Sequence, residues 1–260
     1  MTASSLPFIG KNVLVPRGKK QAKSFSDLVA SYGGNPVEIP LIAFRPVEIT
    51  EEALAKIAQL HTFDWIIFTS NIAVETFLSY VNLHQQKDFP KIAAIGEKTR
   101  SCLHRFGLQV DFMPSEYVAE GFVKEFLPFV KKGMKILIPK GNLARNYIYT
   151  ALSEKGSHVD ELIMYETYFP EESRQLIKEK AGVLDILTFT SPSTVDHFMG
   201  EVKKNNLFHM LDNSVIGCIG PVTRAKVESY GLTVHTAPDV YTVPHMLENI
   251  IAYLEGIVIE

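Results

Sequence analysis

The sequence predicts an α/β protein made of two doubly wound parallel-sheet domains. Short β-branched runs alternate along the chain with amphipathic helical segments of about ten to fifteen residues, a pattern typical of parallel sheets covered by helices. The same series of strand, polar turn and helix also occurs twice in one order. Together these observations favour two similar domains over one large one.

Ten strands are expected, in two sets of five. Each is a short run rich in Val, Ile and Phe, followed in most cases by a small or polar turn and a helical pattern. The expected strands are residues 13–16, 36–40, 64–69, 91–95 and 109–112 in the first set, and 135–138, 159–164, 184–190, 214–219 and 232–236 in the second.

The internal repeat can be followed residue by residue. VLVPRG at residues 13–18 matches ILIPKG at residues 136–141, which lies 123 residues later. Thr69-Ser70 recurs 121 residues later as Thr190-Ser191, and both pairs precede apolar residues at the i, i+3, i+4, i+7 spacing of an amphipathic helix. AIGEKTR at residues 94–100 recurs as CIGPVTR 124 residues later. Taken alone, this linear repeat suggests two halves that meet near residue 130.

The repeated turns are the expected ligand-binding places. Doubly wound sheets bind ligands beyond the carboxyl ends of their strands, where strands lead into helices. Ser191-Pro192 and Gly220-Pro221 read as N-caps followed by Pro at the first helical position. Because exposed helix N-termini attract anions, two such domains facing each other would form a cleft lined by similar donors.

Composition limits the class of partner. A formal net charge of −3 and the lack of a basic run argue against nucleic acid. Cys102 and Cys218 lie far apart without a metal-ligand spacing, so we expect buried thiols, no metal and no cofactor. MTASSLPFIG lacks the features of a secretion signal, and no run is long enough for a membrane span, so a cytoplasmic protein is expected. No obligate oligomer signal is present, which favours a monomer.

Motifs of covalent or metal catalysis are missing from the sequence. It contains no GxSxG elbow, HExxH, Walker loop or complete GxGxxG. The eight His residues are scattered without a second ligand at a useful spacing, which favours surface or capping roles.

Over nearly its whole length, the sequence resembles the uroporphyrinogen-III synthase family. The ordered segments that carry the resemblance are VLVPRG, NPVEIPLIAF, WIIFTSNIAVETF, AAIGEKT, ILIPKGNLARNYIYTAL, VDELIMYETY, LTFTSPSTVDHF and CIGPVTRAKVESYGL. The resemblance implies two flavodoxin-like domains joined by a two-stranded β linker. It places residues 1–42 and 168–260 in the first domain and residues 43–167 in the second.

The resemblance also implies an activity and a substrate. The expected reaction is the cyclisation and dehydration of hydroxymethylbilane, a linear tetrapyrrole with eight carboxylates, to uroporphyrinogen III with the last pyrrole ring inverted. Loss of the terminal hydroxyl gives an azafulvene that is attacked at a substituted pyrrole carbon through a spiro intermediate. Much of the catalysis is then positioning of the substrate ends.

Tyr165 is the expected catalytic residue, because its position matches the active-site tyrosine of the family. A phenol can donate a proton to a departing hydroxide, although a pKa near 10 makes it a modest acid. The alternative is that Tyr165 only packs at the domain junction.

The carboxylates of such a substrate would need hydroxyl, amide and charged donors, and the repeated turns supply them. For most of these residues, helix capping or a solvated surface is the competing interpretation. Arg17 lies at the first turn of the first repeat, equivalent to Lys140, and could add a charge. The donor set also departs from strict repetition, since Asn71-Ile72 stands where Pro192-Ser193 follows the other Thr-Ser pair. The candidate substrate-binding residues are Ser70, Asn71, Gly96, Thr99, Lys140, Asn142, Ser191, Ser193, Thr194, Gly220 and Thr223.

Two other function classes stay open from the residues alone. One is a non-catalytic two-domain module that closes on a small anion, although such modules are usually exported. The other is a nucleotide-using transferase with paired α/β domains, which the missing Gly-rich phosphate loop disfavours.

Overall fold

The chain folds into two compact units. The computed structural model describes residues 6–83 and 88–257. Unit 1 is formed by Met1–Ala43 and Tyr168–Glu260, and unit 2 by Phe44–Thr167. These crossings lie beside the expected ones after residues 42 and 167. That each unit is an independent domain stays a prediction.

Unit 1 contains a four-stranded sheet with strand order β2-β1-β8-β9. All of its described pairings are parallel. Its strands are β1 (Asn12–Val15), β2 (Asn35–Glu38), β8 (Ile186–Phe189) and β9 (Val215–Cys218). Its helices are α1 (Lys19–Ser31), α7 (Glu171–Lys180), α8 (Pro192–Lys204), α9 (Pro221–Glu228) and α10 (Val243–Leu254), with short 3-10 turns at Ala181–Val183 and Phe208–Met210.

Unit 2 contains a five-stranded sheet with strand order β3-β7-β6-β4-β5. Its strands are β3 (Ala43–Pro46), β4 (Trp65–Phe68), β5 (Lys91–Ala94), β6 (Lys135–Gly141) and β7 (His158–Tyr168). Its helices are α2 (Glu51–Ala58), α3 (Asn71–Leu78), α4 (Glu97–Arg105), α5 (Ala119–Phe126) and α6 (Tyr147–Glu154), with 3-10 turns at Leu60–Thr62 and Leu127–Phe129. β3 was not among the expected strands, and a linker role for β3 with β7 stays a prediction.

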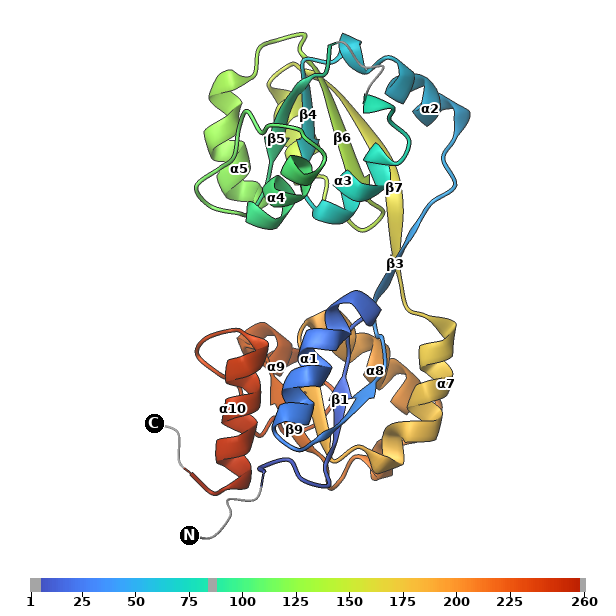
Figure 1. Cartoon of the computed structure of the whole chain (residues 1–260), viewed down its shortest axis with the longest axis vertical. Helices are drawn as coiled ribbons and strands as arrows, with labels where there is room; N and C mark the ends of the chain where they lie inside the picture. The colour runs from blue at the N-terminus through green and yellow to red at the C-terminus, as the bar shows by residue number, and fades with distance from the viewer. Residues whose placement is uncertain (1–5, 84–87, 258–260) are drawn as a thin grey trace. The chain divides into compact units, whose positions relative to one another are not determined.

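Helices cover both faces of each sheet (Figure 1), and the strand sequences explain why. Along β1, Val13 and Val15 pack against α1 and α10, whereas Leu14 faces α7, α8 and α9. In β4 the same alternation sends Trp65 toward α5 and Ile66 toward α3. Because successive strand residues point to opposite faces, continuous apolar runs of this kind specify a sheet that is buried on both sides.

Each sheet combines strands from both copies of the sequence repeat. In unit 1, β1 and β2 of the first repeat lie beside β8 and β9 of the second. In unit 2, β4 and β5 of the first repeat lie beside β6 and β7 of the second. Each unit therefore completes its sheet with strands from both halves of the sequence, which gives both the flavodoxin-like order of a doubly wound sheet.

Two expected strands, residues 109–112 and 232–236, are wrong as strands. Each forms a single parallel bridge, Ala93 with Phe112 and Gly217 with Thr236. The carboxylate of Asp111 accepts the backbone N–H of Ile92 (2.8 Å), and Nδ1 of His235 accepts that of Ile216 (2.9 Å). A side chain thus takes the N–H that a ladder would have used, and pairing ends after one residue.

In each unit an aspartate just before one strand binds the first residue of the neighbouring strand. The carboxylate of Asp64 accepts the N–H of Lys135, and that of Asp185 accepts the N–H of Asn12, each at 2.8 Å. In both cases the backbone N–H of the aspartate bonds in return to the carbonyl of the same residue. These reciprocal bonds set the register of β4 against β6 and of β8 against β1, because they fix the first residue of each pair.

Candidate functional site

The expected catalytic tyrosine lies at the point where strand order reverses in unit 2. The chain runs from β4 to β5 on one side of the sheet and from β6 to β7 on the other, and β4 and β6 are neighbours. Ser70 follows β4, Gly141 ends β6, and Tyr165 pairs with Gly141 from β7 after a register shift at Lys140 and Gly141. In sheets of this kind ligands bind beyond the carboxyl strand ends at such a switch point.

The ring of Tyr165 lies directly against the backbone of Gly141. A Cβ added to Gly141 would lie 2.5 Å from Cε2 and 2.6 Å from Cζ of Tyr165. No other residue type fits there without moving the ring, so the glycine of the PKG turn is required by the tyrosine. Phe44 packs edge-on against the same ring, with centroids 5.8 Å apart. Sequence reasoning missed both supports, although the repeated glycine of PRG and PKG was a signal for the first.

Ser70 connects the phenol to a helix start. Its side chain accepts the N–H of Ala73 (3.1 Å) as the N-cap of α3, and its Oγ lies 3.2 Å from the hydroxyl oxygen of Tyr165. A hydroxyl has one proton and two lone pairs. Since one lone pair of Ser70 is used by Ala73, its proton can point to the phenol oxygen and leave the phenol proton free to donate elsewhere.

Asn142 holds the end of β7 in place. Its side-chain oxygen accepts the N–H of Thr167 (2.9 Å), and its own N–H donates to the carbonyl of Tyr165 (3.0 Å). Both bonds lie on the C-terminal side of Tyr165 along the strand, one on each side of Glu166. Asn142 therefore acts on the tyrosine through the backbone, although its side chain is exposed.

Lys140 is buried inside unit 2 rather than displayed at its surface. Its side chain is 4% exposed, and its ammonium donates to Glu161 (2.8 Å) and to Asn146 (2.9 Å). A lysine whose charge is already paired and removed from water is poorly placed to bind a second anion.

The turn after β5 offers backbone rather than side-chain donors. Gly96 is the N-cap of α4 and has φ +94°, a left-handed conformation that favours glycine. Thr99 is buried, and its hydroxyl donates to the carbonyl of Ile95 (3.1 Å). Asn71, at the first position of α3, is half-buried. The open donors at the two turns after β4 and β5 are therefore backbone N–H groups of the first helical turns and the Asn71 side chain.

Unit 1 repeats this arrangement with a hydroxyl-rich turn. Ser191 caps α8 in a capping box with Thr194, and its Oγ lies 3.1 Å from that of the exposed Ser193. Thr194 is buried, and its hydroxyl donates to the carbonyl of Ser191 (2.6 Å). Gly220 caps α9 in extended backbone, and Thr223 is buried in the first turn. Of these residues, the structure exposes the Ser193 hydroxyl most clearly.

Arg17 lies at the switch point of unit 1, where β1 and β8 are neighbours. The side chain is partly buried, and removal from water lowers the pKa of its guanidinium. Among the residues that the structure describes, it has no hydrogen-bond or ion-pair partner. An unpaired cation at this position is a suitable donor for a carboxylate.

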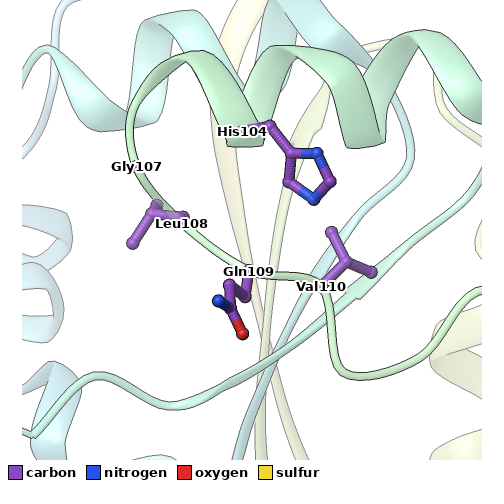
Figure 2. Close-up of a pocket in the computed structure, with 5 residues that line it drawn as sticks. All are labelled: His104, Gly107, Leu108, Gln109 and Val110. Atoms are coloured by element: carbon purple, nitrogen blue, oxygen red, sulfur yellow. The ribbon is translucent and has the colours of Figure 1, made fainter.

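A surface hollow of about 470 Å³ lies elsewhere, at the C-terminal end of α4. Figure 2 shows that the imidazole of His104 lies near the loop that carries Leu108, Gln109 and Val110. None of the expected site residues lines it. In the described part of the chain, no three His, Cys, Asp or Glu side chains are grouped as metal ligands. Within residues 6–83 and 88–257, no helix combines the length and apolarity of a membrane crossing.

Comparison with known proteins identifies one family. The family model described as Uroporphyrinogen-III synthase HemD matches residues 23–248. The uroporphyrinogen-III synthase of Chlorobaculum parvum is 31% identical over 92% of this chain and 98% of its own. That of Synechococcus elongatus is 30% identical over 93% of this chain and 94% of its own.

Solved structures with a similar fold are known. A mutant uroporphyrinogen III synthase from Thermus thermophilus superposes with a TM-score of 0.63 at 19% identity, covering 95% of this chain and 99% of its own. The uroporphyrinogen-III synthetase of Helicobacter pylori gives a TM-score of 0.56 at 20% identity, covering 93% and 98%. At these identities the structures support the two-domain α/β fold.

Proposed function

The chain belongs to the uroporphyrinogen-III synthase family, and from that premise we propose how its residues carry out the reaction. It is a cyclising lyase of porphyrin biosynthesis. The substrate is hydroxymethylbilane, which is dehydrated and closed to uroporphyrinogen III with its last pyrrole ring inverted. The observation that supports our mechanism best is the Tyr165 phenol, fixed between Gly141 and Ser70 at the switch point of unit 2.

The first step is loss of the terminal hydroxyl of the substrate. Tyr165 donates its phenol proton to that hydroxyl, which leaves as water while the adjacent pyrrole becomes the azafulvene electrophile. Ser70 donates to the phenol oxygen at 3.2 Å and stabilises the negative charge that develops there. The substituted carbon of the last pyrrole ring attacks this azafulvene and forms the spiro intermediate, and its bond to the neighbouring methylene bridge then breaks to give a second azafulvene. The unsubstituted α-carbon of the same ring attacks that bridge carbon and loses its proton. This proton returns to Tyr165, so the enzyme is unchanged after one turnover.

The choice of ring carbon depends on holding the substrate and needs no covalent intermediate with the protein. Correct placement of reacting atoms lowers a barrier by several kcal/mol, on the order of 7 or more in favourable cases. Asn142, Gly141 and Phe44 contribute by fixing the tyrosine, because each contacts it or the adjacent backbone. We assign Asn142 this positioning role rather than direct substrate contact.

We propose a narrower set of carboxylate donors than the sequence alone suggested. In unit 1 the proposed donors to substrate carboxylates are Arg17, Ser191, Ser193 and the backbone N–H groups in the first turn after Gly220. In unit 2 they are Asn71 and the backbone N–H groups in the first turn after Gly96. The side chains of Thr99, Thr194, Thr223 and Lys140 support the turns from inside, because all four are buried.

The test is to supply the protein with enzymatically generated hydroxymethylbilane and resolve the product isomers. We expect uroporphyrinogen III to form in excess over a sample without protein, in which the substrate closes spontaneously to the symmetrical type I isomer. A product that is type I only, with intact folded protein, would contradict the proposal. Binding of the substrate without any turnover would support the anion-binding module instead.

A further inference from the structure

Two exposed tyrosines lie beside the glycines that cap α4 and α9. Tyr117 is 53% exposed and Tyr241 is 61% exposed. A Cβ added to Gly96 would lie 3.9 Å from Cβ and 4.0 Å from Cγ of Tyr117. A Cβ added to Gly220 would lie 3.1 Å from Cδ1 and 3.3 Å from Cγ of Tyr241. Each tyrosine thus borders the start of a helix that follows a strand of its sheet.

The two tyrosines are equivalent in the internal repeat. They are separated by 124 residues, the same displacement as between Gly96 and Gly220. Each stands two residues before the next helix, since α5 begins at Ala119 and α10 at Val243. The residues around them differ, SEYVAE in one repeat and DVYTVP in the other. An aromatic ring therefore occupies the same place in both units although its surroundings have changed.

Their place in the fold is the edge where ligands of doubly wound sheets bind. Gly96 follows β5, which neighbours β4 and therefore the Ser70 turn. Gly220 follows β9, which neighbours β8 and therefore the Ser191 turn. Among the described residues, neither phenol has a hydrogen-bond partner. Each tyrosine is consequently more than half exposed, with a hydroxyl that no described residue binds, at the edge that carries the proposed donors.

A purely structural role accounts for only part of this arrangement. An apolar residue just before an N-cap often packs on the fourth helical residue, here Phe122 for Tyr117 and Met246 for Tyr241. Both partners are fully buried. Such packing explains an apolar residue at this position, but it does not require a large ring that keeps more than half of its surface in water.

We infer that Tyr117 and Tyr241 are aromatic platforms, each able to hold a pyrrole ring of the linear tetrapyrrole. This inference rests on the proposed function. A pyrrole is an electron-rich aromatic ring, and a tyrosine offers it an edge or an offset face. The carboxylate arms of the same pyrrole can then reach N–H groups in the first turn of α4 or α9. In α9 these groups begin at Val222, because Pro221 has no N–H. Ring and anion recognition are thus combined within a few ångströms.

The test compares Tyr117→Leu and Tyr241→Leu with Tyr117→Phe and Tyr241→Phe. Leucine keeps apolar packing but removes the ring, whereas phenylalanine keeps the ring. We expect each leucine variant to raise KM for hydroxymethylbilane about three- to tenfold, the size of one aromatic pair, with little change in thermal stability. The phenylalanine variants should retain KM within about twofold. Tyr80→Leu, which changes an exposed tyrosine two residues beyond the C-terminal end of α3, is the matched control and should leave KM unchanged.

The outcomes separate this inference from the proposed function. If the unaltered protein forms uroporphyrinogen III but both leucine variants keep its KM, the platforms are overturned while the function stands. A lower Tm with unchanged KM would show that the tyrosines only pack. If the unaltered protein forms no type III product, the proposed function fails first, and equilibrium binding of the substrate to the same variants still decides whether the rings contact it.

Discussion

The first strand-to-helix turn is built from nearly the same residues in both units, yet its cation has opposite roles. In unit 2, Lys140 of the PKG turn is buried and paired with Glu161. In unit 1, Arg17 of the PRG turn has no partner among the described residues, and the equivalent glutamate, Glu38, accepts from Ser26 (2.5 Å) instead. One copy of the repeat thus uses its cation to hold the fold, and the other leaves it available for a ligand.

The tyrosine that we propose as catalytic shows the same divergence. Tyr165 of unit 2 corresponds to Ile42 of unit 1 at the 123-residue displacement. Among the described residues, a Cβ added to Gly18 would approach the carbonyl oxygen of Ile42, at 3.7 Å, whereas Gly141 lies under an aromatic ring. Duplication therefore supplied two equivalent scaffolds, and a phenol at this position occurs in only one of them.

The largest effect should come from the buried cation. Lys140→Met leaves the Glu161 carboxylate without its ion-pair partner, which should lower the free energy of unfolding by about 3 kcal/mol. Arg17→Met should change it by less than about 0.5 kcal/mol while raising KM for the substrate. Urea denaturation of both variants measures the difference. Equal losses of stability would mean that the two turns do not differ in the way described.

The second comparison concerns the tyrosine itself. Tyr165→Phe keeps the ring over Gly141 but removes the proton donor, so we expect kcat to fall about 100-fold with the fold retained. Steady-state kinetics and circular dichroism provide the measurement, and Tyr80→Phe is the matched control. Unchanged turnover would remove Tyr165 from the proton transfer and leave it as a packing residue.

A smaller and more symmetrical effect is expected where the units are alike. Asp64→Ala and Asp185→Ala each remove a carboxylate that accepts the first N–H of a neighbouring strand. We expect losses of about 1 kcal/mol for the exposed Asp64 and about 2 kcal/mol for the partly buried Asp185, which also lies 3.6 Å from Lys11. Chemical denaturation tests this order. No loss in either variant would show that backbone pairing alone sets the register.

The smallest expected effect is a pH dependence of stability. It arises at His235, which stands in unit 1 where Asp111 stands in unit 2. Burial lowers the pKa of His235 from 6.5 in the folded state, where its Nδ1 accepts the N–H of Ile216. The unfolded chain therefore binds the proton more readily, so this contribution to stability is present above about pH 6.5 and is lost as the pH falls below it. The loss should be about 1 kcal/mol or less, because the ring is partly exposed.

Denaturation between pH 7.5 and 5 distinguishes this residue from the other histidines. His235→Asp reproduces the unit 2 arrangement and should reduce the decline in stability over that range. If the variant and the unaltered protein decline in parallel, protonation of His235 does not contribute.

Much of the fold was predictable because its signals are local. Neighbouring residues are enough to indicate apolar runs of strand length, amphipathic helices and polar turns. Eight of the ten expected strands accordingly coincide with strands of the structure. Residues 109–112 and 232–236 failed because Asp111 and His235 bind the adjacent strand through their side chains. Nothing in the local pattern distinguishes such a side-chain acceptor from one more ladder residue.

The candidate site was predictable in its position but not in which groups are open. The repeated turns lie at the carboxyl ends of the strands. Ser70 and Tyr165, which the sequence offered as separate candidates, have hydroxyl oxygens 3.2 Å apart. Burial, however, separates the candidates. The hydroxyls of Thr99 and Thr194 bond to backbone carbonyls inside the first helical turn, whereas Ser193, one residue away from Thr194, is exposed. Whether a side chain at the start of a helix faces inward or outward depends on what packs against that helix.

The sequence by itself determined the alternation of strands and helices, the repeat and the turns that carry the polar groups. Only the tertiary structure decided that each sheet combines strands of both repeats and that Gly141 accommodates the tyrosine ring. It also decided that Lys140 is internal, whereas Arg17 has no partner among the described residues. The physical reason is the separation along the chain over which each effect acts. Propensity and periodicity act between residues a few positions apart, whereas strand partners, burial and ion pairing depend on groups brought together from more than a hundred residues away.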